Sequence, residues 1–168
     1  MPDILSVNGK EYKIIKLLGR GKGGYSYLAR DGEALVVLKQ IHHEPCDYYT
    51  FGNKIEAERF DYKRLCDADI RIPRMLDIDT ENERILKEYI HGPTVMELSE
   101  RGEITEEIIL AARQMAEKAK SQGLNIDYYP TNFVLQNDLI YYVDYECNIY
   151  DEKWSFDSWG IEFWKNKQ

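Results

Sequence analysis

The chain has 168 residues, with 22 Lys and Arg against 30 Asp and Glu, and its formal net charge is −8 at pH 7. The length predicts one domain with a hydrophobic core, and the acidic balance without a basic stripe argues against a nucleic-acid partner. Apolar runs such as Ala34–Leu38 are too short to span a bilayer, and the first residues do not resemble a signal peptide, so we expect a cytoplasmic protein. The three cysteines have neither disulfide nor zinc spacing and are expected to be reduced packing residues: Cys46, Cys66 and Cys147.

The first motif is a glycine-rich run, Leu17–Leu28, in G-x-G-x-x-G spacing. Its motif glycines are Gly19, Gly21 and Gly24. In dinucleotide-binding folds the third glycine opens a helix, and a carboxylate follows about 20 residues after the first glycine. Here strand-forming residues follow the run, Asp31-Gly32 signals a hairpin turn, and Lys39 stands near the carboxylate position. The segment therefore predicts a strand, a turn and a second strand. The backbone of this hairpin could close over phosphate groups, with Lys39 as a cation beyond it. The alternative is a glycine-rich hairpin that binds no ligand.

The next element is a helix expected over residues 54–65. Its apolar stripe comprises Ile55, Tyr62 and Leu65. Glu58 falls on the same stripe, which aims a carboxylate at the core, and a buried lone charge costs several kcal/mol unless it is paired. Lys39, at the end of a core strand, is the available cation. The alternative is that Glu58 lies at the edge of the stripe, in water. Glu56 would then be the fallback partner of Lys39, although it falls on a different face of the helix.

A short strand is expected over Ile85–Ile90, and His91-Gly92-Pro93 then breaks regular structure. A long amphipathic helix is expected over Thr105–Gln122, with Gly123 as its C-terminal stop. The second half of the chain begins around this helix, and we expect it to be mainly helical with one hairpin.

Oxygen ligands gather in the stretch that follows the long helix. Two apolar strands flank a polar turn there, and a turn centred near Asp138 sets Asn132 across from Asp144. An amide and a carboxylate side by side suit Mg²⁺, which takes one or two protein carboxylates together with substrate phosphates. Asp127 lies just before, in a loop within reach of the same place, and the alternative is that it only forms a turn.

These parts, taken in order, resemble the protein-kinase-like phosphotransferases, and the resemblance covers roughly residues 10–160. It implies an α+β, protein-kinase-like two-lobed fold, with an N-terminal antiparallel sheet carrying one helix and a truncated, mainly helical C-terminal lobe. It also implies a single kinase-like domain over residues 1–168, with an N-lobe over about 1–90, a hinge over about 88–93 and a minimal C-lobe over about 94–168.

The resemblance implies a role for each motif residue. The glycine loop would cover ATP, through Gly19, Gly21 and Gly24. Lys39, held by Glu58, would bind the α- and β-phosphates. The adenine would hydrogen-bond to the backbone of Glu88 and Ile90. Asp127 would orient the acceptor hydroxyl and take its proton as the catalytic base. The magnesium ion would be bound by two oxygen ligands, Asn132 and Asp144.

The chain departs from the family pattern at several places. Asn125 stands where the family has a histidine, and Tyr145-Glu146 stand where it has Phe-Gly. The Asp-aromatic-Glu run and Pro130 before Asn132 look more like aminoglycoside and lipopolysaccharide kinases. Only 24 residues follow Asp144, and the stretch between Glu146 and Asp157 leaves no room for a long activation segment. We therefore expect the platform that normally holds a peptide acceptor to be missing. Asp157-Ser158-Trp159 resembles the family's helix that braces the catalytic loop through a buried Asp.

We therefore expect an ATP- and magnesium-dependent phosphotransferase that moves the γ-phosphate to a hydroxyl, with Ser or Thr of a protein favoured. One alternative is a small-molecule kinase acting on a sugar, aminoglycoside or lipopolysaccharide-type acceptor. Another is a nucleotide-binding pseudokinase that acts as an interaction module. The short C-terminal segment implies either a small acceptor, or an acceptor site completed by a partner chain or a second copy of this chain.

Overall fold

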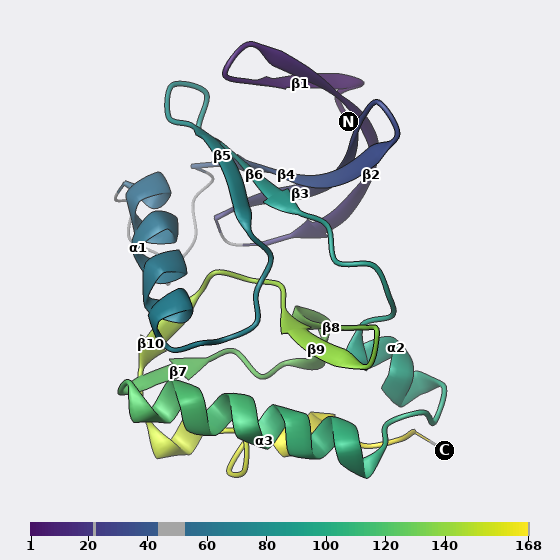
Figure 1. Ribbon diagram of the computed structural model, residues 1–168, viewed down its shortest axis with the longest axis vertical. Helices are drawn as coiled ribbons and strands as arrows, with labels where there is room; N and C mark the ends of the chain where they lie inside the picture. The colour runs from purple at the N-terminus through teal and green to yellow at the C-terminus, as the bar shows by residue number, and fades with distance from the viewer. Residues whose placement is uncertain (22, 44–52, 168) are drawn as a thin grey trace. The chain divides into compact units, whose positions relative to one another are not determined.

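The computed structural model describes residues 1–21, 23–43 and 53–167 of the chain. The chain divides into two compact units, whose elements are labelled in Figure 1. The first unit comprises Met1–Arg59 and Arg74–Tyr89, and the second comprises Phe60–Pro73 and Ile90–Gln168. Within the described ranges, no helix is long and apolar enough to cross a membrane.

The first unit is built on one antiparallel sheet of six strands in the order β1-β2-β3-β4-β6-β5. Its strands are β1 (Ile4–Val7), β2 (Lys10–Arg20), β3 (Gly24–Asp31), β4 (Ala34–Ile41), β5 (Met75–Asp79) and β6 (Arg84–Glu88). Alternating apolar residues of these strands share one buried face, among them Tyr12, Leu38 and Leu86. Helix α1 (Lys54–Asp67) begins in this unit, where Ile55 packs against Ile41 and Ile85.

Hydrogen bonds tie the two edges of the curled sheet together. The turn between β1 and β2 places Asn8 in the left-handed region at φ 50°. The Asn8 backbone nitrogen donates to Asp79 Oδ2 at 2.9 Å, and its side-chain nitrogen donates to Asp77 Oδ1 and to the carbonyl of Ile78, each at 2.9 Å. These bonds join the β1–β2 turn to β5 at the opposite edge of the sheet.

Asp79 makes this tie dependent on pH. Its side chain is only 3% exposed and accepts from the side chain and backbone of Asn82 and from the Asn8 backbone, which together lower its pKa from 3.8 to about 2. Since the folded pKa lies below the unfolded one, this stabilisation is present above about pH 4 and is lost as the pH falls toward 2. We predict a loss of about 2 kcal/mol of unfolding free energy over that interval, measured by urea denaturation.

The Asp79→Ala variant should lack this part of the pH dependence, whereas Glu81→Ala, on the exposed β5–β6 turn, should keep it. An unchanged pH profile in Asp79→Ala would show that the buried carboxylate is not its source.

The second unit combines two helices with two small antiparallel sheets. Its helices are α2 (Val95–Glu100) and α3 (Glu106–Ser121). Its sheets pair β7 (Leu124–Ile126) with β10 (Cys147–Ile149), and β8 (Phe133–Gln136) with β9 (Leu139–Tyr142). A capping box of Thr94 and Glu97 starts α2, Thr105 caps α3, and Gly123 at φ +70° follows its end. Short 3₁₀ helices cover Pro130–Asn132, Glu152–Trp154 and Gly160–Phe163.

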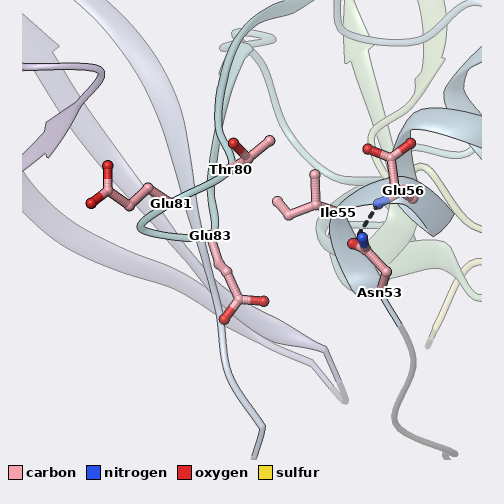
Figure 2. Close-up of a pocket in the computed structure, with 6 residues that line it drawn as sticks. All are labelled: Asn53, Ile55, Glu56, Thr80, Glu81 and Glu83. Carbon is pink, nitrogen blue, oxygen red and sulfur yellow. Dashed lines mark hydrogen bonds between the residues drawn. The ribbon is translucent and has the colours of Figure 1, made fainter.

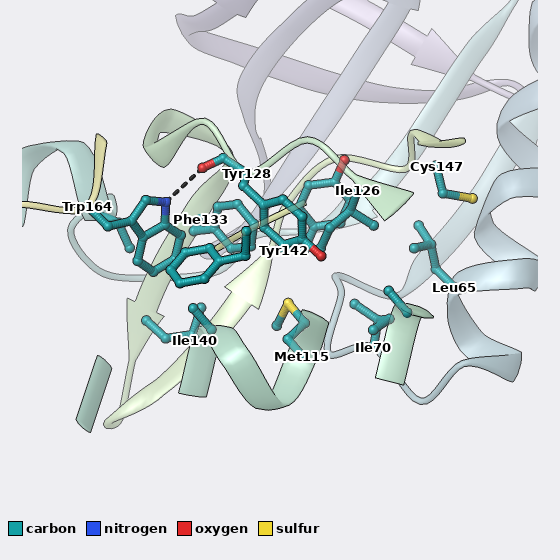
Figure 3. Packing of buried hydrophobic residues seen from close by; sticks show 14 of the residues in the cluster. Leu65, Ile70, Met115, Ile126, Tyr128, Phe133, Ile140, Tyr142, Cys147 and Trp164 are labelled. Carbon is teal, nitrogen blue, oxygen red and sulfur yellow. Dashed lines mark hydrogen bonds between the residues drawn. The ribbon is translucent and has the colours of Figure 1, made fainter. Parts of the chain in front are cut away.

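An aromatic cluster forms the centre of the core of the second unit (Figure 3). Phe133 packs its ring against Tyr142 at 5.2 Å and against Trp164 at 4.9 Å, measured between ring centroids. Trp164 also donates from Nε1 to the carbonyl of Tyr128 at 2.7 Å. Met115 of α3 and Leu65 of α1 complete this side of the core.

The expected protein-kinase-like fold with a mainly helical C-terminal lobe is wrong. The described chain is mainly a curled antiparallel sheet with two further two-stranded sheets, and its only α-helices are α1, α2 and α3. After Gly123 the apolar runs are short and rich in aromatic and β-branched residues, and they pair as strands instead of continuing as helices. The expected helices over residues 54–65 and 105–122 are confirmed, as is the hairpin beyond them.

The cysteines agree only in part with the expectation that they pack. Cys147 is buried, and burial, followed by the charge of Asp61, raises the pKa of its thiol to about 12, so it stays protonated. Cys66 is exposed, so it is not a core residue. Cys46 lies outside the described residues.

Candidate functional site

The glycine run forms the hairpin between β2 and β3. Gly21 donates from its backbone nitrogen to the carbonyl of Gly24 at 2.9 Å, which closes the turn. His42, just after β4, donates its backbone nitrogen to the carbonyl of Gly23 at 3.0 Å, and its Nε2 lies 2.9 Å from the carbonyl of Gly21. A strand follows Gly24, which confirms the expected strand, turn and strand.

The three motif glycines differ in what surrounds them. A Cβ atom on Gly24 would lie 2.6 Å from the carbonyl oxygen of Gln40 and 3.0 Å from Cε of Lys39, so packing requires glycine there. For Gly19, no described heavy atom lies within 4 Å of the position that a Cβ atom would take, and for Gly21 the nearest is the carbonyl oxygen of Gly24 at 3.9 Å. Packing against the protein therefore explains the third glycine but not the first two.

Lys39 and Glu58 form an ion pair inside the first unit. Nζ of Lys39 donates to Oε1 of Glu58, and the two side chains are only 13% and 15% exposed. The apolar stripe of the helix thus predicted the partner of Glu58 correctly, while Glu56, the fallback, is exposed and lies near Arg59. Oε2 of Glu58 is buried and accepts no hydrogen bond from the described residues.

Glu88 and Ile90, the two residues expected to bind adenine, lie where the chain passes from the first unit to the second. Glu88 ends β6, and its backbone nitrogen donates to the carbonyl of Arg74 at 2.9 Å. Its Oε1 accepts from the Arg74 nitrogen at 3.2 Å. The Glu88 N–H is therefore used within the first unit. Ile90 is buried and is the first residue of the last segment of the second unit.

The β8–β9 hairpin sets the spacing of the expected magnesium ligands. Its turn residues, Asn137 and Asp138, have φ values of 51° and 63°, as a two-residue type I′ turn requires. The register therefore places Asn132 across from Val143, whose nitrogen donates to the Asn132 carbonyl at 2.9 Å. The expectation that Asn132 faces Asp144 is wrong by one residue, although Asp144 follows directly at the same end of the hairpin.

Asp127 lies in the loop after β7 and is linked to Asn132. Oδ1 of Asp127 accepts from the backbone nitrogen of Tyr129 at 3.1 Å, so the side chain does form the turn that the alternative predicted. The Asp127 carbonyl accepts from Nδ2 of Asn132 at 3.3 Å. Asp144 Oδ1 accepts from the Tyr145 nitrogen at 2.7 Å.

Three side-chain oxygens in this part of the second unit have no donor among the described residues: Asp127 Oδ2, Asn132 Oδ1 and Asp144 Oδ2. The described residues contain no group of three or more His, Cys, Asp or Glu side chains arranged to hold a metal ion. Carboxylate and amide oxygens are the ligand types that Mg²⁺ takes together with water and substrate phosphates, so magnesium binding here stays a prediction.

Sequence spacing did not reveal the residues that hold the Asp127 loop. Asp157, expected as a buried brace, has a 69% exposed side chain and pairs with Nε of Arg113 at 3.0 Å. Trp164 holds the loop instead, through its bond to the Tyr128 carbonyl. Asn125, in the position of the family histidine, is buried and donates to the carbonyl of Trp154 at 2.9 Å. An aromatic-rich C-terminal segment was the only signal of these long-range contacts.

Two pockets formed by the described residues do not contain the motif residues. One, of about 290 Å³ in the first unit, is shown in Figure 2, where the Asn53 side chain caps α1 by accepting from the Glu56 nitrogen at 3.1 Å. It is lined by Asn53, Ile55, Glu56, Thr80, Glu81 and Glu83. The other, of about 580 Å³, lies in the second unit beside α3 and includes Arg71 and Lys118.

No protein-family model matches the chain, and no curated protein matches its sequence. The resemblance to protein-kinase-like phosphotransferases therefore rests on the sequence motifs alone.

Proposed function

We propose that the chain is an ATP- and magnesium-dependent phosphotransferase that moves the γ-phosphate to a hydroxyl, with Ser or Thr of a protein favoured. The observation that carries the proposal is the buried ion pair of Lys39 and Glu58 behind the glycine hairpin. A buried ion pair is commonly no more stabilising than apolar side chains of similar volume. A lysine held rigidly by a carboxylate instead suits the binding of nucleotide phosphates.

The glycine hairpin supports a phosphate ligand. Gly19 and Gly21 have open space around them, so no side chain at either position obstructs approach to the hairpin, although the Gly21 N–H is itself used in the turn. Backbone N–H groups in such loops bind phosphate oxygens, and a side chain would obstruct that approach.

The second unit supplies oxygen groups for the rest of the reaction. Asn132 and Asp144 would bind Mg²⁺, whose positive charge offsets the charge of the transferring phosphoryl group. Asp127 would orient the acceptor hydroxyl and accept its proton through Oδ2, because Oδ1 is already used in the turn. The proposal depends on these groups and not on a helical C-terminal lobe.

MgATP should stabilise the chain against thermal unfolding. At about 100 times its dissociation constant, a ligand that binds only the folded state stabilises it by roughly 2.7 kcal/mol. We predict this stabilisation for the parent chain and its loss in Lys39→Ala, measured from melting curves with and without MgATP. Lys10→Ala is the matched control, since it removes the exposed Lys10–Asp31 pair of the same sheet. Melting curves of the parent that do not respond to MgATP would contradict the nucleotide site.

Incubation with γ-labelled MgATP, alone and with cell lysate, tests the transfer itself. Label on protein supports the favoured acceptor, and label on a small molecule supports the alternative of a metabolic kinase. Stabilisation by MgATP without transfer supports a pseudokinase, which Asn125 and the turn-forming role of Asp127 Oδ1 favour.

A further inference from the structure

At one end of the β7–β10 pair, a side chain takes the place of a backbone–backbone hydrogen bond. Ile126, the last residue of β7, pairs with Cys147, the first residue of β10, so Asp127 and Glu146 come next at this end of the ladder. The hydroxyl of Tyr142 joins them: the Asp127 nitrogen donates to it at 3.3 Å, and it donates to the Glu146 carbonyl at 2.7 Å. The phenol thus stands where a direct backbone hydrogen bond would otherwise continue the ladder.

Tyr142 is fixed firmly enough to serve as such a link. It is the last residue of β9, it is 0% exposed, and its ring packs against Phe133, its partner in the strand register. The hydroxyl position is therefore set by the core.

We propose that the Tyr142 hydroxyl is a positioning group for phosphate transfer, which fixes the backbone of the base Asp127 and of the magnesium ligand Asp144 together. The bond from Tyr142 to Glu146 closes a five-residue segment that contains Asp144, and the bond from Asp127 starts the loop that carries the base. A single hydroxyl thereby sets the spacing of two groups that must act on one reaction. This inference rests on the proposed function for its catalytic consequence, while the backbone link is testable without it.

Tyr142→Phe removes the hydroxyl and keeps the ring. We expect kcat for transfer from MgATP to fall by about 10- to 100-fold, because displacement of reacting groups by about 1 Å has effects of that size. The KM for MgATP should change less than kcat, since the variant leaves Lys39 and the glycine hairpin of the first unit unchanged, although the magnesium contact of Asp144 is displaced. The backbone amide NMR signal of Asp127 should shift and its hydrogen exchange should accelerate. Tyr141→Phe is the control, because the Tyr141 ring faces Arg71 and its hydroxyl makes no hydrogen bond in the described residues.

These measurements test the hydrogen-bond link through Tyr142 separately from the proposed phosphate transfer. If the parent transfers no phosphate, the proposed function fails, and the Asp127 amide signals alone decide whether the hydroxyl link exists. Loss of stability in Tyr142→Phe with unchanged kcat and unchanged Asp127 signals would show that the tyrosine only packs, and would overturn the proposal. In the parent itself, a slowly exchanging Tyr142 hydroxyl proton near the Asp127 amide proton is expected, and its absence would also contradict the link.

Discussion

Replacing Asp127 by asparagine should slow phosphate transfer about a thousandfold, which corresponds to about 4 kcal/mol at the barrier. The amide cannot accept the proton of the acceptor hydroxyl, and general base catalysis contributes effects of this order. The fold should persist, because an asparagine oxygen can still accept from the Tyr129 nitrogen and maintain the turn. The measurement is kcat with γ-labelled MgATP, together with melting curves that report MgATP binding.

Asp138→Asn is the matched control for this prediction. It makes the same change from carboxylate to amide in the same unit, at a turn position with φ 63° that asparagine readily adopts. Its transfer rate should equal that of the parent. If Asp127→Asn transfers as fast as the parent, Asp127 is not the base. If it instead loses the stabilisation by MgATP, the carboxylate acts in nucleotide binding.

The sequence predicted those features that depend on neighbours along the chain. The glycine hairpin followed from turn residues between strand formers, and the partner of Glu58 followed from the 3.6-residue period of α1. Gly123 follows the end of helix α3 with a positive φ, a conformation that glycine adopts readily, so the end of this helix was also predicted. The hairpin near Asp138 was also predicted, although its two-residue turn shifts the register by one position relative to a turn centred on that residue.

Features that depend on long-range packing were not predictable in this way. The bond from Trp164 to Tyr128 joins residues 36 positions apart, and no spacing rule connects them. The same holds for the link through Tyr142, which depends on two sheets being placed together in the second unit. The expectation of a mainly helical second half came from the long helix over residues 105–122 and from the family resemblance. The motif residues of that resemblance specify local geometry without specifying the segments between them.

Replacing Gly92 by alanine should destabilise the second unit by more than about 4 kcal/mol, the range reached only by severe core or backbone defects. Gly92 has φ +146°, and an added Cβ would lie 1.9 Å from the carbonyl oxygen of Leu135 and 3.0 Å from its carbonyl carbon. Relief by movement of β8 is opposed by two nearby bonds, from the Leu135 nitrogen to Pro93 and from the His91 nitrogen to Gln136. Urea unfolding of the variant and the parent measures the difference.

Gly102→Ala separates this clash from the strain of the backbone conformation. Gly102 also has a positive φ, +69°, but no described heavy atom lies within 4 Å of the position its Cβ would take. Strain alone should therefore cost about 1 kcal/mol at Gly102, and the excess at Gly92 measures the contact with Leu135. Equal, mild effects of the two substitutions would mean that β8 can move. Since Asn132 directly precedes β8, such movement would also displace this proposed magnesium ligand, so a Gly92→Ala variant that still folds should show a reduced kcat for phosphate transfer.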